Sequence, residues 1–141
     1  MAAKTELHAT NEALELNVID LIAEDLDDLN HVNNVRYLEW IQDISKEHWT
    51  ARTPDQLRKE VVWVVLNHYI EYKNAAFLGD KVEIKTYIAK TKGAISTRVV
   101  EMRLENSEAI LVKSTTEWCL LNASTFKPMR ISDEIRSYFE G

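Results

Sequence analysis

The sequence predicts an α+β domain in which a five-stranded antiparallel sheet wraps around one long central helix. Apolar residues recur at helical spacing over residues 34–49, and no second long helix is evident before the C-terminal tail. One strand-like run precedes that helix and four follow it without another helix of comparable length between them. Helices segregated to one face of an antiparallel sheet define this architecture.

The composition is that of a single soluble globular domain. The chain has 141 residues, which is enough to bury a core without disulfides, and 45% of them are apolar against 28% charged. The net charge of −6 argues against a general nucleic-acid binder, which needs a basic face to neutralise phosphates. Cys119 is the only cysteine, so we interpret it as an inert core thiol.

Targeting signals are not evident in the sequence. The first residues lack the apolar run of a signal peptide, and no stretch approaches the ~20 apolar residues that a membrane span needs. We therefore expect a cytoplasmic protein without a membrane span.

The first half of the chain is expected to hold one strand and the helix. Residues 1–12 are polar and are predicted to be a flexible N-terminus, which leaves residues 13–141 as the folded domain. Alternating apolar residues predict a strand at 13–22, and a carboxylate-rich loop follows it. The expected buried face of the helix consists of Val35, Leu38, Ile41 and Ile44, flanked by Tyr37, Trp40 and Trp49.

The second half is expected to supply the other four strands, at residues 61–73, 81–88, 95–104 and 109–121. The first of these would span ~43 Å if straight, so a bend or bulge is expected in it. The second alternates apolar with charged residues, which predicts one wet face. Thr53-Pro54-Asp55 predicts a turn or a short helical turn, and Ser132 is the expected N-cap of a short terminal helix.

Residues 25–37, Asp-Leu-Asp-Asp-Leu-Asn-His-Val-Asn-Asn-Val-Arg-Tyr, carry the most specific motif of the chain. They resemble the signature D-x-D-x-x-G-H-V-N-N-x-x-Y of hotdog thioesterases of the 4-hydroxybenzoyl-CoA thioesterase type. With Trp40 they are also similar to plant acyl-ACP thioesterases. Weaker matches lie at residues 70–73, 78–82, 116–118 and 126–131, so the resemblance covers residues 12–139. It implies a hotdog fold and hydrolysis of a thioester.

Two positions depart from the family pattern. Asn30 stands where the signature has Gly, and Asn is the next most tolerant residue in a left-handed backbone conformation. Acyl-ACP thioesterases carry further polar catalytic residues where this chain has Ala75-Ala76. The second departure favours the acyl-CoA branch.

Thioester hydrolysis needs an attacking oxygen and donors for the developing oxyanion. Asp27 can supply the first, either as a nucleophile or as a general base on water. The N-terminus of the helix can supply the second, and Asn33 or Asn34 is suited to cap it. The resemblance implies that the backbone N–H of Asn34 points at the thioester carbonyl. The alternative for Asp27 is a structural one, as a helix cap or in an Asx turn.

Substrate contacts are expected from His31, Asn33 and Tyr37, and, by resemblance, from a hairpin that approaches the nucleotide or pantetheine arm of coenzyme A. The hairpin residues are Lys90, Lys92, Gly93 and Ala94. Each assignment has a structural alternative. His31 could fix the loop by a hydrogen bond, Tyr37 could be core packing, and the hairpin could be a charged tip.

No metal or other cofactor is expected, because the spacing of His31, His48 and His68 matches no compact ligand motif. Glu39 and Asp43 lie four residues apart on the helix and are interpreted as a solvated face.

The leading hypothesis is an acyl-CoA thioesterase, a hydrolase. Its alternatives are an acyl-ACP thioesterase and a hotdog module that binds acyl-CoA without hydrolysing it. The resemblance also implies a homodimer or homotetramer in which each active site takes residues from two subunits. A long antiparallel edge strand is a surface on which such pairing can occur.

Overall fold

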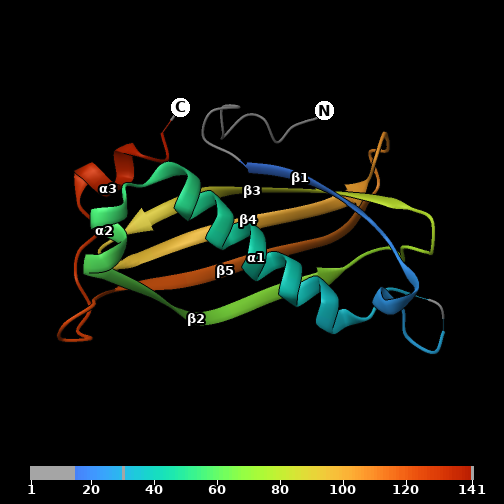
Figure 1. The fold of residues 1–141 in the computed structure, drawn as a ribbon, viewed down its shortest axis with the longest axis horizontal. Helices are drawn as coiled ribbons and strands as arrows, with labels where there is room; N and C mark the ends of the chain where they lie inside the picture. The colour runs from blue at the N-terminus through green and yellow to red at the C-terminus, as the bar shows by residue number, and fades with distance from the viewer. Residues whose placement is uncertain (1–14, 30, 141) are drawn as a thin grey trace.

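The computed structural model describes residues 15–29 and 31–140 and contains the predicted sheet and long helix (Figure 1). The strands are β1 (Glu15–Asp20), β2 (Val61–Tyr72), β3 (Lys81–Lys92), β4 (Ile95–Leu104) and β5 (Ile110–Asn122). The helices are α1 (Asn34–Arg52), α2 (Asp55–Glu60) and α3 (Asp133–Ser137), with a 3-10 turn, η3 (Ala23–Asp25), after β1. The predicted flexible segment 1–12 lies outside the described residues.

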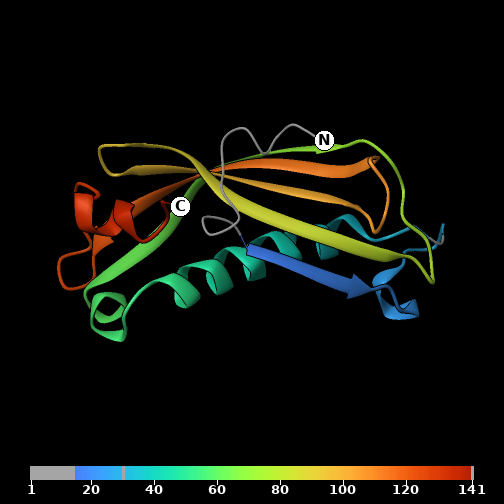
Figure 2. The same ribbon diagram turned by 90° about the horizontal axis from the view of Figure 1, so that it is seen from above.

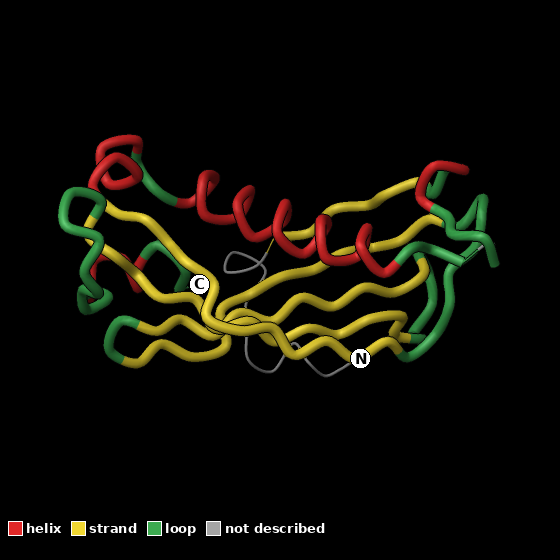
Figure 3. Tube along the Cα trace, turned by 90° about the horizontal axis from the view of Figure 1, so that it is seen from below, coloured by secondary structure: helices red, strands yellow, loops and turns green. Residues whose placement is uncertain are grey.

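The five strands form one antiparallel sheet in the order β1-β3-β4-β5-β2. The sheet curves over α1, which runs along its inner face (Figures 2 and 3). β2 follows α1 and α2 in sequence yet pairs with β5, so it occupies one edge of the sheet and β1 occupies the other. This is the predicted hotdog arrangement.

One irregularity in the strand pairing lies in the strand where the sequence predicts it. The pairing of β2 with β5 shifts register between Val65 and Asn67, so Leu66 has no partner across the strand. This confirms the bend or bulge expected in the long first run. A second shift lies in β3 between Ile88 and Lys90. Both shifts add twist to long strands, which helps a sheet of this length to curve around a helix.

The buried face of α1 differs from the predicted one. Its buried residues are Tyr37, Trp40, Ile41, Ile44, Ser45 and His48, whereas Val35 is 61% exposed. The helix is rotated so that two aromatic rings face the core instead of a valine. An aromatic side chain removes more apolar area from water than a valine does, so this rotation is the more stable one.

The outer face of β3 and β4 is more buried than predicted, because the alternation of apolar and charged residues in β3 predicts a solvent-exposed face. Glu101 is 1% exposed and accepts hydrogen bonds from Arg103 at 3.1 Å and from the hydroxyl of Tyr87 at 3.3 Å. Lys85 adds an ion pair at 3.6 Å. Burial, with the nearby Glu101, raises the pKa of Tyr87. A carboxylate can be buried here because opposite charges surround it.

Candidate active site at the start of the long helix

The carboxylate of Asp27 is held by the backbone of its own loop. Oδ1 accepts hydrogen bonds from the amides of Leu29 at 2.9 Å and His31 at 3.2 Å, and the amide of Asp27 donates to the His31 carbonyl at 2.8 Å. The side chain is exposed in the single chain. Among the described residues, no hydrogen bond of Asp27 reaches α1 and none is accepted by Oδ2. The loop therefore contains the Asx turn that was the structural alternative, with one carboxylate oxygen left open to solvent.

Asn33 is the N-cap of α1. Its side chain accepts a hydrogen bond from the amide of Val35 at 2.9 Å, and its carbonyl accepts one from the amide of Arg36, also at 2.9 Å. The amide of Asn34 donates to no protein acceptor in the described part of the chain. As the first N–H of a 19-residue helix, it lies at the positive end of the helix dipole. An available donor of this kind can stabilise an oxyanion.

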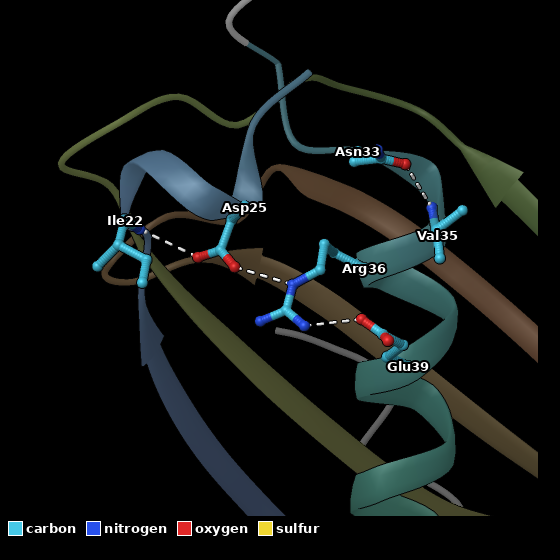
Figure 4. Close-up of polar contacts among 6 residues, drawn as sticks. All are labelled: Ile22, Asp25, Asn33, Val35, Arg36 and Glu39. Atoms are coloured by element: carbon cyan, nitrogen blue, oxygen red, sulfur yellow. Dashed lines mark hydrogen bonds and ion pairs between the residues drawn. The ribbon is translucent and has the colours of Figure 1, made fainter.

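An ion pair between a buried carboxylate and a partly exposed arginine joins the loop to the helix (Figure 4). The Asp25 carboxylate, with a side chain 3% exposed, accepts hydrogen bonds from the amide of Ile22 at 3.0 Å and from Nε of Arg36 at 2.9 Å. Arg36 continues to Glu39 at 2.7 Å. The backbone closes the same junction, because the amide of Asn33 donates to the Asp25 carbonyl at 2.9 Å. The hydrogen bonds to Glu39 and Asp25 raise the pKa of Arg36.

This ion pair was not predicted from the sequence. A signal exists: Arg36 is the only Lys or Arg between Lys4 and Lys46, and it follows a loop rich in carboxylates. One cation among many acids at the start of a helix indicates a specific partner. Which acid it selects is decided by the return of the loop onto the helix.

His31 and Tyr37 lie in different surroundings. The exposed ring of His31 packs edge-on against Phe77 at 5.3 Å, while its backbone closes the Asp27 loop. Tyr37 is 3% exposed, and its ring packs against those of Trp40 and Tyr72, with centroids 5.7 Å and 5.9 Å away. Burial, and then the nearby Tyr72, raise the pKa of Tyr37 to about 12. Tyr37 is thus part of the core, and its contact with substrate stays a prediction.

The hairpin lies at the other end of the molecule from Asp27. β3 starts beside the Asp27 loop, where the amide of Leu21 donates to the Asp80 carbonyl at 3.1 Å, and it ends at Lys92. Its 12 residues span ~36 Å from end to end. The predicted hairpin residues Lys90, Lys92, Gly93 and Ala94 are therefore not brought to Asp27 and Asn34 within one chain.

The backbone of the hairpin is shaped by Gly93. Its φ of 62° lies in the left-handed region, and a Cβ added there would meet nothing within 4 Å. Glycine is thus required by the turn and not by a close neighbour within the chain. The Gly93 carbonyl accepts a hydrogen bond from Ile131 at 2.8 Å, and that of Ala94 accepts one from Leu120 at 2.9 Å. The first bond joins the hairpin to the C-terminal segment, and the second joins it to β5.

The three histidines considered for a metal lie in separate places. His31 is in the Asp27 loop, His48 is buried on α1, and His68 in β2 bonds through Nδ1 to the hydroxyl of Thr116 at 2.7 Å. Burial lowers the pKa of His68. Asn30, which replaces the signature glycine, lies outside the described residues. Within residues 15–29 and 31–140, no helix is long and apolar enough to cross a membrane.

Comparisons with known proteins identify relatives. A family model described as the acyl-ACP thioesterase N-terminal domain matches residues 19–139. The chloroplastic acyl-[acyl-carrier-protein] hydrolase FATB3 of Cuphea viscosissima is 29% identical over 87 residues, which are 61% of this chain and 21% of that protein. The long-chain acyl-CoA thioesterase FadM of Escherichia coli (strain K12) is 24% identical over 120 residues, which are 82% of this chain and 89% of that protein.

A solved structure shares the fold. The probable thioesterase YbaW from Escherichia coli matches with a TM-score of 0.77 at 23% identity, over 89% of this chain and 96% of that one. The chain spans about a fifth of the length of the plant relatives it matches, since the alignment covers 21% of the Cuphea protein. It spans most of FadM.

Proposed function

Because the chain belongs to the acyl-ACP thioesterase N-terminal domain family, we propose that it hydrolyses acyl thioesters, with an acyl-CoA as the substrate. The observation that carries this proposal is the start of α1. The loop before the helix holds the carboxylate of Asp27 by two backbone hydrogen bonds. Seven residues after Asp27, the backbone N–H of Asn34 is available as a donor.

In this proposal Asp27 acts in one of two ways. As a nucleophile, its carboxylate oxygen attacks the thioester carbon, the C–S bond breaks to release the thiolate of coenzyme A, and water then hydrolyses the mixed anhydride. As a general base, Asp27 takes a proton from the water that attacks the same carbon, and the C–S bond again breaks to release the thiolate. The two amides on Oδ1 hold the orientation of the carboxylate, so that Oδ2 is the atom available to react. The Asn34 N–H and the helix dipole stabilise the oxyanion on the thioester carbon. Asp25 and Arg36 act by position, because their ion pair sets the loop against the helix.

The carrier is the finer part of the proposal. FadM, a long-chain acyl-CoA thioesterase, is matched over most of its length, whereas the plant acyl-ACP enzymes are matched over about a fifth of theirs. Ala75-Ala76 also replaces the polar residues of the acyl-ACP branch. Both observations favour coenzyme A. The family match itself favours acyl-ACP as the second candidate.

We further propose that the working enzyme contains at least two copies of the chain. The hairpin with Lys90 and Lys92 is ~36 Å from the Asp27 loop in one chain, so a coenzyme A bound by both needs the hairpin of a second copy. β2 is an edge strand with exposed apolar side chains, which favours pairing along it. These side chains are Val64, Val65, Leu66, Tyr69 and Tyr72, between 36% and 65% exposed.

The test of the catalytic role is Asp27→Asn, which preserves shape and removes the charge. We expect thiol release from acyl-CoA to fall by about 10²–10⁴-fold, the usual contribution of a general base. Asp28→Asn is the matched control, because it removes the neighbouring exposed carboxylate and should leave the rate within about 2-fold.

The assay should cover short, long and aromatic acyl-CoAs, and acyl-ACPs of equal chain length. An Asp27→Asn variant as fast as the parent would show that Asp27 is not catalytic. Faster turnover of acyl-ACP would replace the proposed carrier. Saturable acyl-CoA binding by the parent chain without thiol release would establish the non-catalytic module instead.

The test of assembly is Tyr69→Asp, which places a charge on the exposed face of the edge strand. We expect light scattering to show a dimer or larger assembly for the parent and a monomer for the variant, with activity lost together with assembly. Phe126→Asp is the control, since Tyr69 and Phe126 are both 65% exposed but Phe126 lies outside β2. A monomeric and active parent chain would contradict this proposal.

A further inference from the structure

A cavity of about 320 Å³ lies under the C-terminal half of α1. Its lining comes from that half of the helix, from the inner faces of β2 to β5, and from α3 with the residues after it. These elements gather at the end of the molecule opposite the Asp27 loop (Figures 1 and 2). Along α1 the lining residue Ser45 is 11 residues from Asn34, or ~17 Å. The cavity is thus separate from the proposed hydrolase site of the same chain.

Arg98 of β4 supplies a buried positive charge to the cavity wall. The residue is 5% exposed, and its Nη1 donates to Nδ1 of His48 at 2.9 Å and to the hydroxyl of Thr86 at 3.0 Å. A guanidinium has no acceptor, so His48 Nδ1 is the acceptor and both partners of Nη1 are uncharged. Among the described residues, no carboxylate forms an ion pair with Arg98.

An isolated buried charge is costly, and an anion beside it would relieve that cost. Burial lowers the pKa of Arg98 to about 10, so the guanidinium keeps its charge at neutral pH. The contrast with Glu101 on the same strand is clear, because Glu101 has cationic partners in Lys85 and Arg103. Arg98 has no such partner of opposite charge among the described residues, and it lines the cavity.

Four aromatic side chains form another part of the wall. Trp49 packs edge-on against Trp63 at 5.6 Å and stacks on Phe139 at 5.9 Å, and all three rings line the cavity. Trp118 lines it as well, and its buried Nε1 has no hydrogen-bond partner among the described residues. Flat apolar walls suit an aliphatic or aromatic body.

The entrance is also mainly cationic. The exposed side chains of Lys46, Lys90 and Arg136 line the cavity together with the exposed Glu140. Three cations against one carboxylate favour an anionic ligand over a neutral one, in a chain whose net charge is −6.

We propose that this cavity binds a free carboxylic acid with an apolar body, its carboxylate paired with Arg98 and its body between the tryptophans. This site goes beyond thioester hydrolysis, because none of its residues belongs to the Asp27 loop. It shares only Lys90 with the hydrolase proposal, in which the hairpin of one copy contacts the coenzyme A bound to a second copy. The volume, at the lower end of ordinary ligand pockets, suits a medium-chain or bicyclic aromatic acid.

The test uses decanoate and 2-naphthoate as probes, with decanol and 2-naphthol as bodies of the same kind without a carboxylate. The chain is labelled with 5-fluorotryptophan and followed by ¹⁹F NMR, because Trp49, Trp63 and Trp118 line the cavity and Trp40 does not. We expect the acids to shift those three resonances saturably and to leave Trp40 unchanged. The alcohols should bind at least 10-fold more weakly.

Arg98→Met should weaken binding of the acids by about 10–100-fold and leave the alcohols unaffected, since it removes a charge-assisted hydrogen bond. Arg103→Met is the matched control on the outer face of the same strand and should bind as the parent does. The comparison of acid with alcohol on the parent chain requires no variant, so it holds even if Arg98→Met fails to fold.

Several outcomes would overturn the proposal. These are no saturable shift at 1 mM acid, equal binding of acid and alcohol, or a shift of Trp40 alone. Loss of acid binding in Asp27→Asn would also overturn it, because the acid would then occupy the hydrolase site. Loss of hydrolysis in Asp27→Asn with acid binding retained supports both proposals, and an inactive parent chain that still binds the acids supports this one alone.

Discussion

The arginines at the two ends of α1 have different kinds of partner. At its N-terminus, Arg36 meets Asp25 and Glu39, and the loop is closed by backbone hydrogen bonds. Near its C-terminus, Arg98 meets only the neutral partners His48 and Thr86 among the described residues, and a cavity adjoins it. The first arrangement stabilises a defined loop geometry. The second leaves a charge that a bound anion can neutralise. The first arrangement therefore positions the Asp27 loop, whereas the second is the basis of the proposed binding site for a carboxylic acid.

The largest expected difference between the two ends is in stability. Arg36→Met leaves the nearly buried carboxylate of Asp25 without its cation, so we expect the free energy of unfolding to fall by about 1–3 kcal/mol. Arg98→Met removes a charge that has no ionic partner and should change it by less than about 1 kcal/mol in either direction. Urea unfolding at pH 7 measures both.

Arg130→Met, at an exposed position without an ion pair in the described part of the chain, gives the baseline for losing an arginine. The comparison between the two ends fails if Arg98→Met costs more than Arg36→Met. In that case the bonds to His48 and Thr86 would be the stronger contribution.

The N-cap sharpens the comparison at the first end alone. Asn33→Ala removes the acceptor of the Val35 amide, so we expect a loss of about 1 kcal/mol in the free energy of unfolding. Asn34→Ala, one residue further on, changes an exposed side chain that makes no cap and should stay within about 0.5 kcal/mol. Equal losses in the two variants would show that the cap contributes nothing.

A further effect is visible only at alkaline pH. The pKa of Tyr37 is about 12 in the folded chain and about 10 when unfolded, so its contribution to stability is full below pH 10 and is lost as the pH rises through 12. Tyr37→Phe should therefore lose less stability than the parent between pH 10 and pH 12. Urea unfolding at pH 9 and pH 11.5 tests this, with Tyr69→Phe, at an exposed position, as the control. Equal losses for Tyr37→Phe and the parent would contradict it.

Local pattern was sufficient for the elements and for part of the site. Apolar periodicity predicted α1 and the strands, and the length of β2 predicted a bend or bulge, which the structure places at Leu66. Residue type predicted the cap at Ser132 and narrowed the cap of α1 to Asn33 or Asn34, of which the structure selects Asn33. These features depend on residues within one or two turns of each other. The Asp27 loop was located for the same reason, since its hydrogen bonds join residues at most four apart.

Tertiary structure alone decided which side chains meet. Val35 was expected on the buried face and Tyr37 took that place, because the rotation of a helix depends on what the sheet offers opposite it. Arg98 and His48 are 50 residues apart, and no local pattern relates them. The same holds for the ~36 Å between the Asp27 loop and the hairpin, which follows from the direction of β3. Backbone propensity acts between neighbours in the chain, whereas packing and charge act between neighbours in space.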